Sequence, residues 1–209
     1  MKIRTFDPGR PIESPSINDE RWEYFHIRGL SAYAIDHAVL FIDGTTHNTN
    51  MKDMRIKNDK FYMKADFRGA LRECARFILQ IHYYGIRDYS LLFPDFLVND
   101  PDRATRLGLF YEEAEKCFDN GAWLSFALMC GAIFEHLLYF KLNGSERQYG
   151  RLILKARNAG IIQKEESDTM EAIRKLRNII HRNRLSEGYI QRAEAMDIKT
   201  LIERLIVSL

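Results

Sequence analysis

Hydrophobic residues recur along most of the chain at steps of three and four, which is the spacing of a helix with one buried face. Leu30, Tyr33 and Ala34 follow this spacing early in the chain, after Trp22 and Phe25, and Cys74, Phe77, Ile78 and Ile81 follow it further on. The first half is therefore predicted to contain helices over 20–41 and 66–84, a turn-like segment over 45–60, an extended arm over 1–19, and an alternative short strand over 39–42.

The second half has a stronger helical pattern. Pro94 and Pro101 exclude a continuous helix across them, so we place a domain boundary near residue 100. Short links between helices with one apolar face are typical of an antiparallel bundle, and the nearly all-apolar segment 122–142 predicts its central helix. Five helices are predicted here: 105–120, 122–142, 147–158, about 164–184, and 190–209.

These patterns together predict an all-α protein. Residues 1–100 form an extended arm and a mainly helical subdomain, and residues 101–209 form the helical bundle. Of the 209 residues, 46% are apolar and 29% charged, which is typical of a globular protein. The net charge of +2 neither favours nor excludes nucleic acid as a partner.

Cysteine usage and apolar segments indicate where the protein is expected to reside. The three cysteines, Cys74, Cys117 and Cys130, form no CxxC motif, which is typical of reduced thiols in the cytoplasm. The N-terminus lacks the apolar run of a signal peptide, and no segment reaches about 18 uninterrupted apolar residues, so no membrane span is expected.

A basic cluster near the end of the helix predicted over 164–184 is the main candidate for chemistry. At about 100° per residue, Arg174, Arg177, Asn178 and His181 fall on one side of that helix. A histidine transfers protons near neutral pH, and a guanidinium binds phosphate through a planar pair of donors. The cluster therefore suits binding and cleavage of RNA, with Asn178 as a polar orienter. Three further cations extend this RNA-binding face: Lys175, Arg182 and Arg184.

Glu135 lies within the most apolar predicted helix, and a buried charge needs a partner. Glu135 either orients Arg177 or His181, or forms a purely structural pair with an arginine. Its neighbour His136 is interpreted as a structural histidine.

Two segments carry a resemblance to a known family: YEEAEKCFDNGAWLSFALMCGAIFEHLLYFKL and LILKARNAGIIQKEESDTMEAIRKLRNIIHRNR. They resemble the HEPN superfamily, in its branch associated with defence and restriction loci, over the C-terminal half only. The resemblance implies a helical bundle that often dimerises. In active members an Arg and a His, separated by four to six residues, form a metal-independent ribonuclease centre across the dimer.

Arg174 matches this spacing, because six residues lie between it and His181, whereas three residues lie between Arg177 and His181. Which arginine acts with His181 therefore stays open. Some members carry a modified tyrosine two residues after the histidine, where this chain has Asn183.

Two functions follow from these features. The first is a metal-independent endoribonuclease of a bacterial defence or toxin–antitoxin system, acting at the cleft of a homodimer. The second is a non-catalytic helical dimer or adaptor that binds RNA or a companion protein through the same basic face. A structural interpretation also exists, because cations at a helix C-terminus complement its dipole. In a third arrangement, residues 1–100 recognise the target and the bundle only dimerises. The dispersed histidines and the lack of phosphate-binding glycine motifs predict no metal and no cofactor.

Overall fold

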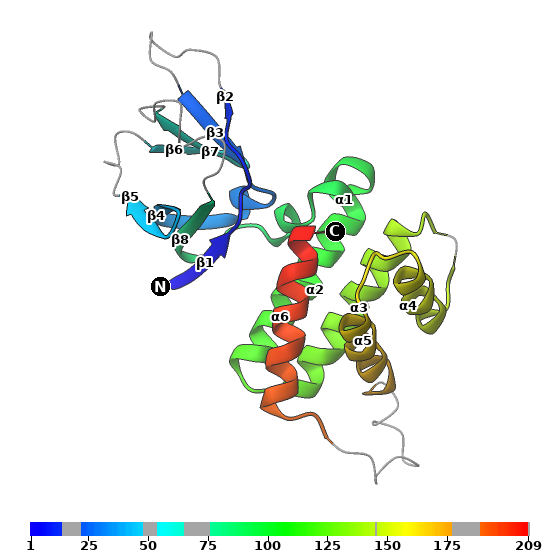
Figure 1. Cartoon of the computed structure of the whole chain (residues 1–209). Coiled ribbons are helices and arrows are strands. Elements are labelled where there is room, and N and C mark those ends of the chain that lie inside the picture. Colours follow the sequence, from blue (N-terminus) through cyan, green and yellow to red (C-terminus); the bar gives the residue numbers. More distant parts are fainter. Residues whose placement is uncertain (14–21, 48–53, 65–75, 145, 177–188, 209) are drawn as a thin grey trace. The chain divides into compact units, whose positions relative to one another are not determined.

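The computed structural model describes residues 1–13, 22–47, 54–64, 76–144, 146–176 and 189–208 (Figure 1). The chain divides into two compact units, Met1–Pro94 and Asp95–Leu209. We name them the β unit and the helical unit, and describe each by itself.

Within its described residues, the β unit contains two antiparallel sheets of four strands each. In the first sheet, the long strands β4 and β8 pair with each other at the centre. The order in this sheet is β1 (Lys2–Phe6), β8 (Phe77–Ile86), β4 (Tyr33–Ile42) and β5 (Thr45–His47). The order in the second sheet is β2 (Ile12–Glu13), β3 (Trp22–His26), β7 (Lys60–Lys64) and β6 (Met54–Lys57).

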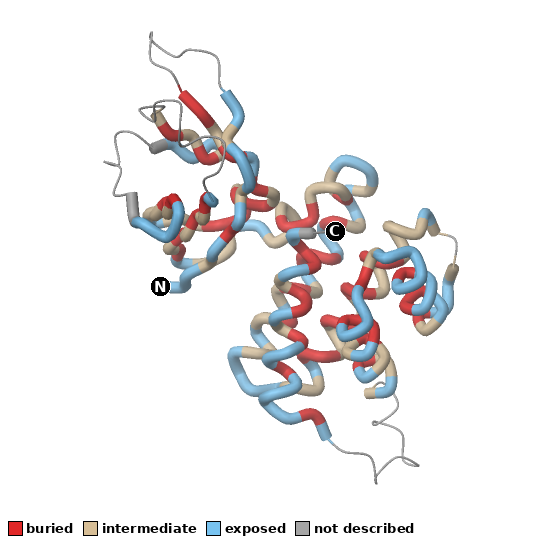
Figure 2. Tube along the Cα trace, viewed as in Figure 1, coloured by how far each residue is buried: buried red, intermediate tan, exposed pale blue. Residues whose placement is uncertain are grey.

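The two sheets share an aromatic core. Every second residue of β8 is buried from Phe77 to Tyr83, which is the alternation of a strand with one face in a core. Phe25 of the second sheet lies 5.2 Å from Phe77 of the first and 6.3 Å from Phe61, measured between ring centroids. Both Phe25 and Phe61 are fully buried, so these rings join the sheets into one hydrophobic core. Figure 2 shows buried segments along the strands of this unit.

Turn residues fix the connections of the β unit. Asp43 and Gly44 both have positive φ, 49° and 78°, as a two-residue hairpin between β4 and β5 requires. Asp59, in the turn before β7, accepts hydrogen bonds from the backbone N–H groups of Gly29 (3.1 Å) and Ser31 (3.0 Å). It thereby ties the short 3₁₀ helix Leu30–Ala32 to the β6–β7 hairpin.

The helical unit is arranged around α3 (Trp123–Lys141), which packs against four other helices. Its buried residues lie on most of its circumference, as expected for a central helix. The surrounding helices are α2 (Pro101–Asp119), α4 (Tyr149–Asn158), α5 (Lys164–Leu176) and α6 (Arg192–Ser208), and the short α1 (Pro94–Asn99) precedes α2.

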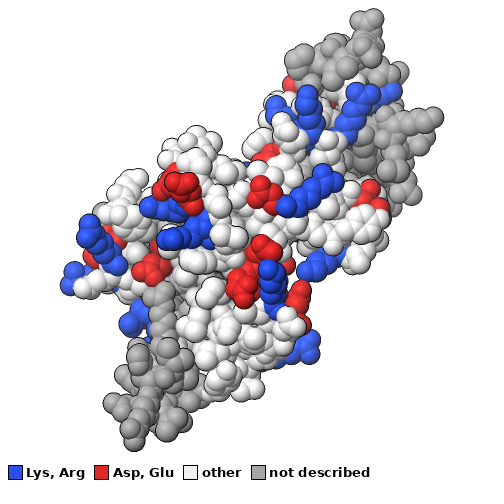
Figure 3. All heavy atoms as spheres, turned by 180° about the vertical axis from the view of Figure 1, so that it is seen from behind, with Lys and Arg blue, Asp and Glu red and all other residues white. Residues whose placement is uncertain are grey.

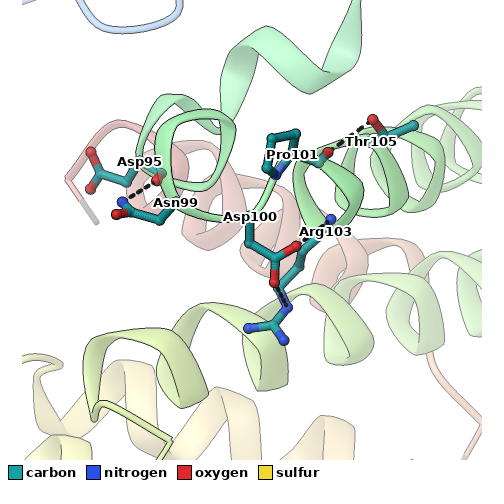
Figure 4. A network of polar contacts seen from close by, with 6 residues as sticks. All are labelled: Asp95, Asn99, Asp100, Pro101, Arg103 and Thr105. Carbon is teal, nitrogen blue, oxygen red and sulfur yellow. Dashed lines mark hydrogen bonds and ion pairs between the residues drawn. The ribbon is translucent and has the colours of Figure 1, made fainter.

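Pro101 lies in the first turn of α2, where a missing N–H costs nothing. Asp100 caps this helix: its carboxylate accepts a hydrogen bond from the backbone N–H of Arg103 (3.1 Å) and lies 3.3 Å from the Arg103 Nε (Figure 4). Since α1 likewise begins at Pro94, the prolines mark helix starts, and no continuous helix crosses them.

The all-α prediction is wrong, because the first half is not mainly helical. The predicted helix over 20–41 is strands β3 and β4 with a 3₁₀ turn between them, and the short strand expected over 39–42 is the end of β4. The described end of the predicted helix over 66–84 is strand β8, and the turn-like segment 45–60 contributes β5 and β6. In this half, pairing between strands distant in the sequence determines the secondary structure, although the local spacing of apolar residues favours helices.

The helices predicted in the second half agree with the structure. The central helix over 122–142 is α3, that over 147–158 is α4, and the last is α6. The predicted helix over 164–184 is helical as α5 up to Leu176, after which it leaves the described residues.

Candidate functional site

Helix α5 carries the described part of the predicted site. Its buried residues Met170 and Ile173 face the bundle, and Glu165 and Glu166 in its first turn complement the positive end of the helix dipole. Arg174 and Lys175 lie in its last turn. A close approach to α3 fixes the position of α5, because a Cβ built on Gly131 would lie only 2.7 Å from the Ile173 Cγ2.

Arg174 is held from two sides. Its Nε donates a hydrogen bond to the Glu171 carboxylate (2.8 Å), one helical turn earlier. Its guanidinium lies along the backbone of α4, since a Cβ on Gly150 would be 3.4 Å from the Arg174 Nε. Among the described residues, the terminal nitrogens of Arg174 have no acceptor, and the side chain is 41% exposed. Glu171 thus orients the guanidinium and leaves its outer donors available.

An open depression surrounds Arg174. It is lined by residues at the start of α4, including Gln148 and Arg151, and by Glu171 and Arg174 of α5. Arg151 also lies 3.9 Å from Glu146. The described lining of the depression therefore contains two cations, Arg151 and Arg174, and the carboxylate of Glu171.

The remaining predicted site residues are only partly described. Lys175 is exposed at the end of α5, and Glu135 is half-buried on α3. Five of them lie outside the described residues: Arg177, Asn178, His181, Arg182 and Arg184.

His136 has structural partners. Its Nδ1 lies 2.9 Å from the Ala132 carbonyl oxygen one turn earlier, and its ring meets Phe110 edge to face at 6.2 Å. These contacts account for this histidine without a ligand.

Other cations of the helical unit pair with carboxylates between helices. Arg204 of α6 bonds to the buried Glu166 of α5, and Lys199 bonds to Glu115 of α2. On the face drawn in Figure 3, basic and acidic side chains of the described residues lie close together. The Arg204–Glu166 and Lys199–Glu115 pairs hold α6 against α5 and α2.

The two described cysteines, Cys117 and Cys130, are free thiols. Burial raises the pKa of Cys130 well above its usual value and also raises the pKa of Cys117. Both thiols are therefore protonated at neutral pH and poor nucleophiles. Cys74 lies outside the described residues.

The sequence patterns missed a group of polar residues in the β unit. Tyr84 donates a hydrogen bond to the Asp36 Oδ1 (2.7 Å), and the Asp36 Oδ2 accepts one from the His37 Nδ1 (2.8 Å). The His37 ring stacks on His82 with 4.1 Å between centroids. The register of β4 against β8 shifts on both sides of Ile35, and such irregularities redirect side chains. The prediction of helices in this half could not reveal this group, because Asp36 and Tyr84 come together only when β4 pairs with β8.

Within the described residues, no group of three or more His, Cys, Asp or Glu side chains is placed to hold a metal ion. One described helix, α3, is long and apolar enough to cross a membrane by length and composition alone, which is weak support for a span because core helices have the same character. Comparisons with family models, curated proteins and solved structures found no match.

Proposed function

We propose that the protein is a metal-independent endoribonuclease of the HEPN type, acting in a bacterial defence or toxin system. His181 transfers the protons and Arg174 binds the scissile phosphate, in a cleft between two copies of the chain. The observation that carries this proposal is the position of Arg174. It lies at the end of α5, with six residues between it and His181, its Nε on Glu171 and 41% of its side chain exposed.

The chemistry of RNA cleavage fits these residue types. The 2′-hydroxyl must lose a proton, the leaving 5′-oxygen must gain one, and the added negative charge needs stabilisation. Histidine serves as base and as acid near neutral pH, and a twofold axis supplies two histidines, one for each transfer. Arginine keeps its charge at any working pH.

The Glu171 contact supports Arg174 over Arg177 as the phosphate-binding residue. A guanidinium fixed through its Nε presents its two terminal nitrogens as a planar fork, which matches two phosphate oxygens. Arg174 also has the spacing that the family resemblance implies.

The test is RNA cleavage in EDTA by four variants of the full chain. His181→Ala should lower kcat about a hundredfold or more, as loss of a general acid or base does. Arg174→Gln should have a similar effect, and Glu171→Gln a smaller one, because Glu171 only positions Arg174. Arg157→Gln is the matched control, since Arg157 is an exposed arginine on α4 that does not line the depression around Arg174. Unchanged cleavage by folded His181→Ala protein would contradict the proposal.

A second function, a non-catalytic module that binds RNA or a partner protein through the same face, is favoured by one observation. Glu171 partly neutralises Arg174, which suits a binding residue as well as a reacting one. In that case, His181→Ala leaves RNA binding intact, whereas Arg174→Gln combined with Arg177→Gln weakens it and flattens its dependence on salt.

A further inference from the structure

The β unit contains a cavity of about 490 Å³, separate from the Arg174 region. Strand β4, the β6–β7 hairpin and the residue after β8 supply its lining, which includes Tyr33, His37, Arg55, Phe61 and Arg87. Its size is within the range of about 300–1,000 Å³ typical of small-molecule sites.

Two arginines give the cavity its charge. In the part of the chain that the structure describes, neither Arg55 nor Arg87 pairs with a carboxylate. The Arg55 guanidinium lies 4.8 Å from the centroid of the buried Trp22 ring, a contact that holds it in place without neutralising its charge. The backbone N–H of Arg87 donates to the Ala32 carbonyl (2.7 Å), which fixes the chain at this point.

Asp36, the acidic residue in the described lining of the cavity, already has hydrogen-bond partners. Asp36 accepts hydrogen bonds from His37 and Tyr84, which lower the pKa of its carboxyl group. Because an ionised carboxylate only accepts, the Nδ1 of His37 carries a proton, and in the neutral ring Nε2 is an acceptor. His37 is thus oriented by Asp36 and by the stack with His82, as a fixed polar group in the wall of the cavity.

The apolar lining defines the rest of the ligand. Ile35 and the exposed Ile56 supply accessible apolar surface to the lining, whereas Tyr33 and Phe61 are buried. Guanidinium groups without a carboxylate partner among the described residues, in a lining that also has apolar surface, suit a molecule with a phosphate at one end and a ring at the other.

We propose that this cavity binds a phosphate monoester of mononucleotide size. Arg55 and Arg87 contact the phosphate, and the His37 Nε2 accepts a hydrogen bond from a hydroxyl or amino group of the ligand. This site belongs to the β unit alone and does not depend on the ribonuclease proposal.

The experiment is isothermal titration of the full chain with the four 5′-mononucleotides, with adenosine as the uncharged counterpart of AMP. At least one mononucleotide should bind, adenosine should not compete with it, and Arg55→Gln and Arg87→Gln should each raise Kd about tenfold or more, because each removes a charge-assisted hydrogen bond. His37→Ala should raise Kd by a smaller factor.

Arg76→Gln is the matched control, since Arg76 is an exposed arginine of the same unit, 3.5 Å from Asp7, and does not line the cavity. It should leave Kd unchanged, as should His181→Ala, which separates this site from the proposed nuclease centre. Absence of binding by all four mononucleotides, or equal Kd values for the folded Arg55, Arg87 and Arg76 variants, would overturn the proposal.

Discussion

The two units differ in how their charged residues are used. In the helical unit, Arg204 and Lys199 bond to carboxylates on neighbouring helices, so these charges help to hold the bundle. In the β unit, Arg55 and Arg87 line a cavity without an acidic partner among the described residues. The charges of Arg204 and Lys199 thus stabilise the fold, whereas Arg55 and Arg87 are the cations that we propose bind a ligand.

The units also differ in the range of the contacts that build them. Helix α3 is specified by a local run of apolar residues, whereas β8 pairs with β1 from the opposite end of the β unit, for instance Tyr83 with Lys2. Each unit has its own core, with Phe134 fully buried in one and Phe25 in the other. We therefore expect the two units to respond separately to core substitutions.

The largest predicted effects are those of Phe134→Ala and Phe25→Ala. Each should destabilise its own unit by about 3–5 kcal/mol, the usual cost of removing a buried phenylalanine. The two tryptophans, Trp22 in the β unit and Trp123 in the helical unit, provide separate fluorescence reporters. Each variant is unfolded by denaturant in two backgrounds, Trp22→Phe and Trp123→Phe, so that one tryptophan reports at a time. The unfolding midpoint should shift only for the tryptophan in the same unit as the substituted phenylalanine. Equal shifts of both reporters would contradict independent cores.

A smaller effect is expected from Gly131→Ala, which tests the contact between α3 and α5. The added methyl meets the Ile173 Cγ2 at 2.7 Å, so the substitution should cost about 1–3 kcal/mol by overpacking. Gly150→Ala is the comparison within the same unit, because its new methyl would lie 3.4 Å from the Arg174 Nε, an ordinary van der Waals contact. It should be neutral or stabilise α4 by about 0.5–1 kcal/mol, the helix preference of alanine over glycine. Thermal unfolding of both variants measures the two effects. Equal melting temperatures of the two variants would contradict the close contact between α3 and α5.

The smallest predicted effect concerns the acid stability of the β unit. The hydrogen bonds from His37 and Tyr84 lower the pKa of Asp36 below its ordinary 3.8. The folded state therefore binds this proton less readily than the unfolded state, so the stabilisation is present above about pH 3.8 and is lost as pH falls through the folded pKa. The difference in melting temperature between the wild type and Asp36→Asn should accordingly shrink on acidification.

Carboxyl NMR titration measures this pKa directly. His37→Ala should raise the Asp36 pKa most and Tyr84→Phe should raise it less, in the order of their contributions. An Asp36 pKa that stays the same in both variants would exclude the proposed hydrogen-bond network.

The sequence predicted the helical unit because its helices are encoded locally. The apolar run over 122–142 and the stop at Asn143 and Gly144, both with positive φ, need no distant partner to be recognised. The β unit was mistaken for helices because Leu30, Tyr33 and Ala34 satisfy a helical spacing by chance, although they belong to a 3₁₀ turn and to β4.

One local signal for the β unit was present in the sequence. Asp43-Gly44 between two apolar segments is typical of a two-residue hairpin, and it is the turn between β4 and β5. The cavity had no such signal. Arg55 and His37 become neighbours in its lining only through the packing of two sheets, which a single sequence does not reveal.

For the candidate nuclease site, the spacing of Arg174 and His181 followed from the sequence alone, whereas the role of Glu171 as the partner of Arg174 did not. A salt bridge three residues apart is common on any helix surface. Its significance comes from the packing of Arg174 against Gly150 on α4.

The central claim is tested most directly by identifying the ends of RNA fragments produced in EDTA. Attack by the 2′-hydroxyl, with His181 as proton carrier, predicts 2′,3′-cyclic phosphate and 5′-hydroxyl ends by mass spectrometry, and no cut where a 2′-deoxynucleotide replaces the attacking one. Intact RNA, or the same fragments from the His181→Ala protein, would contradict a ribonuclease centre at this histidine.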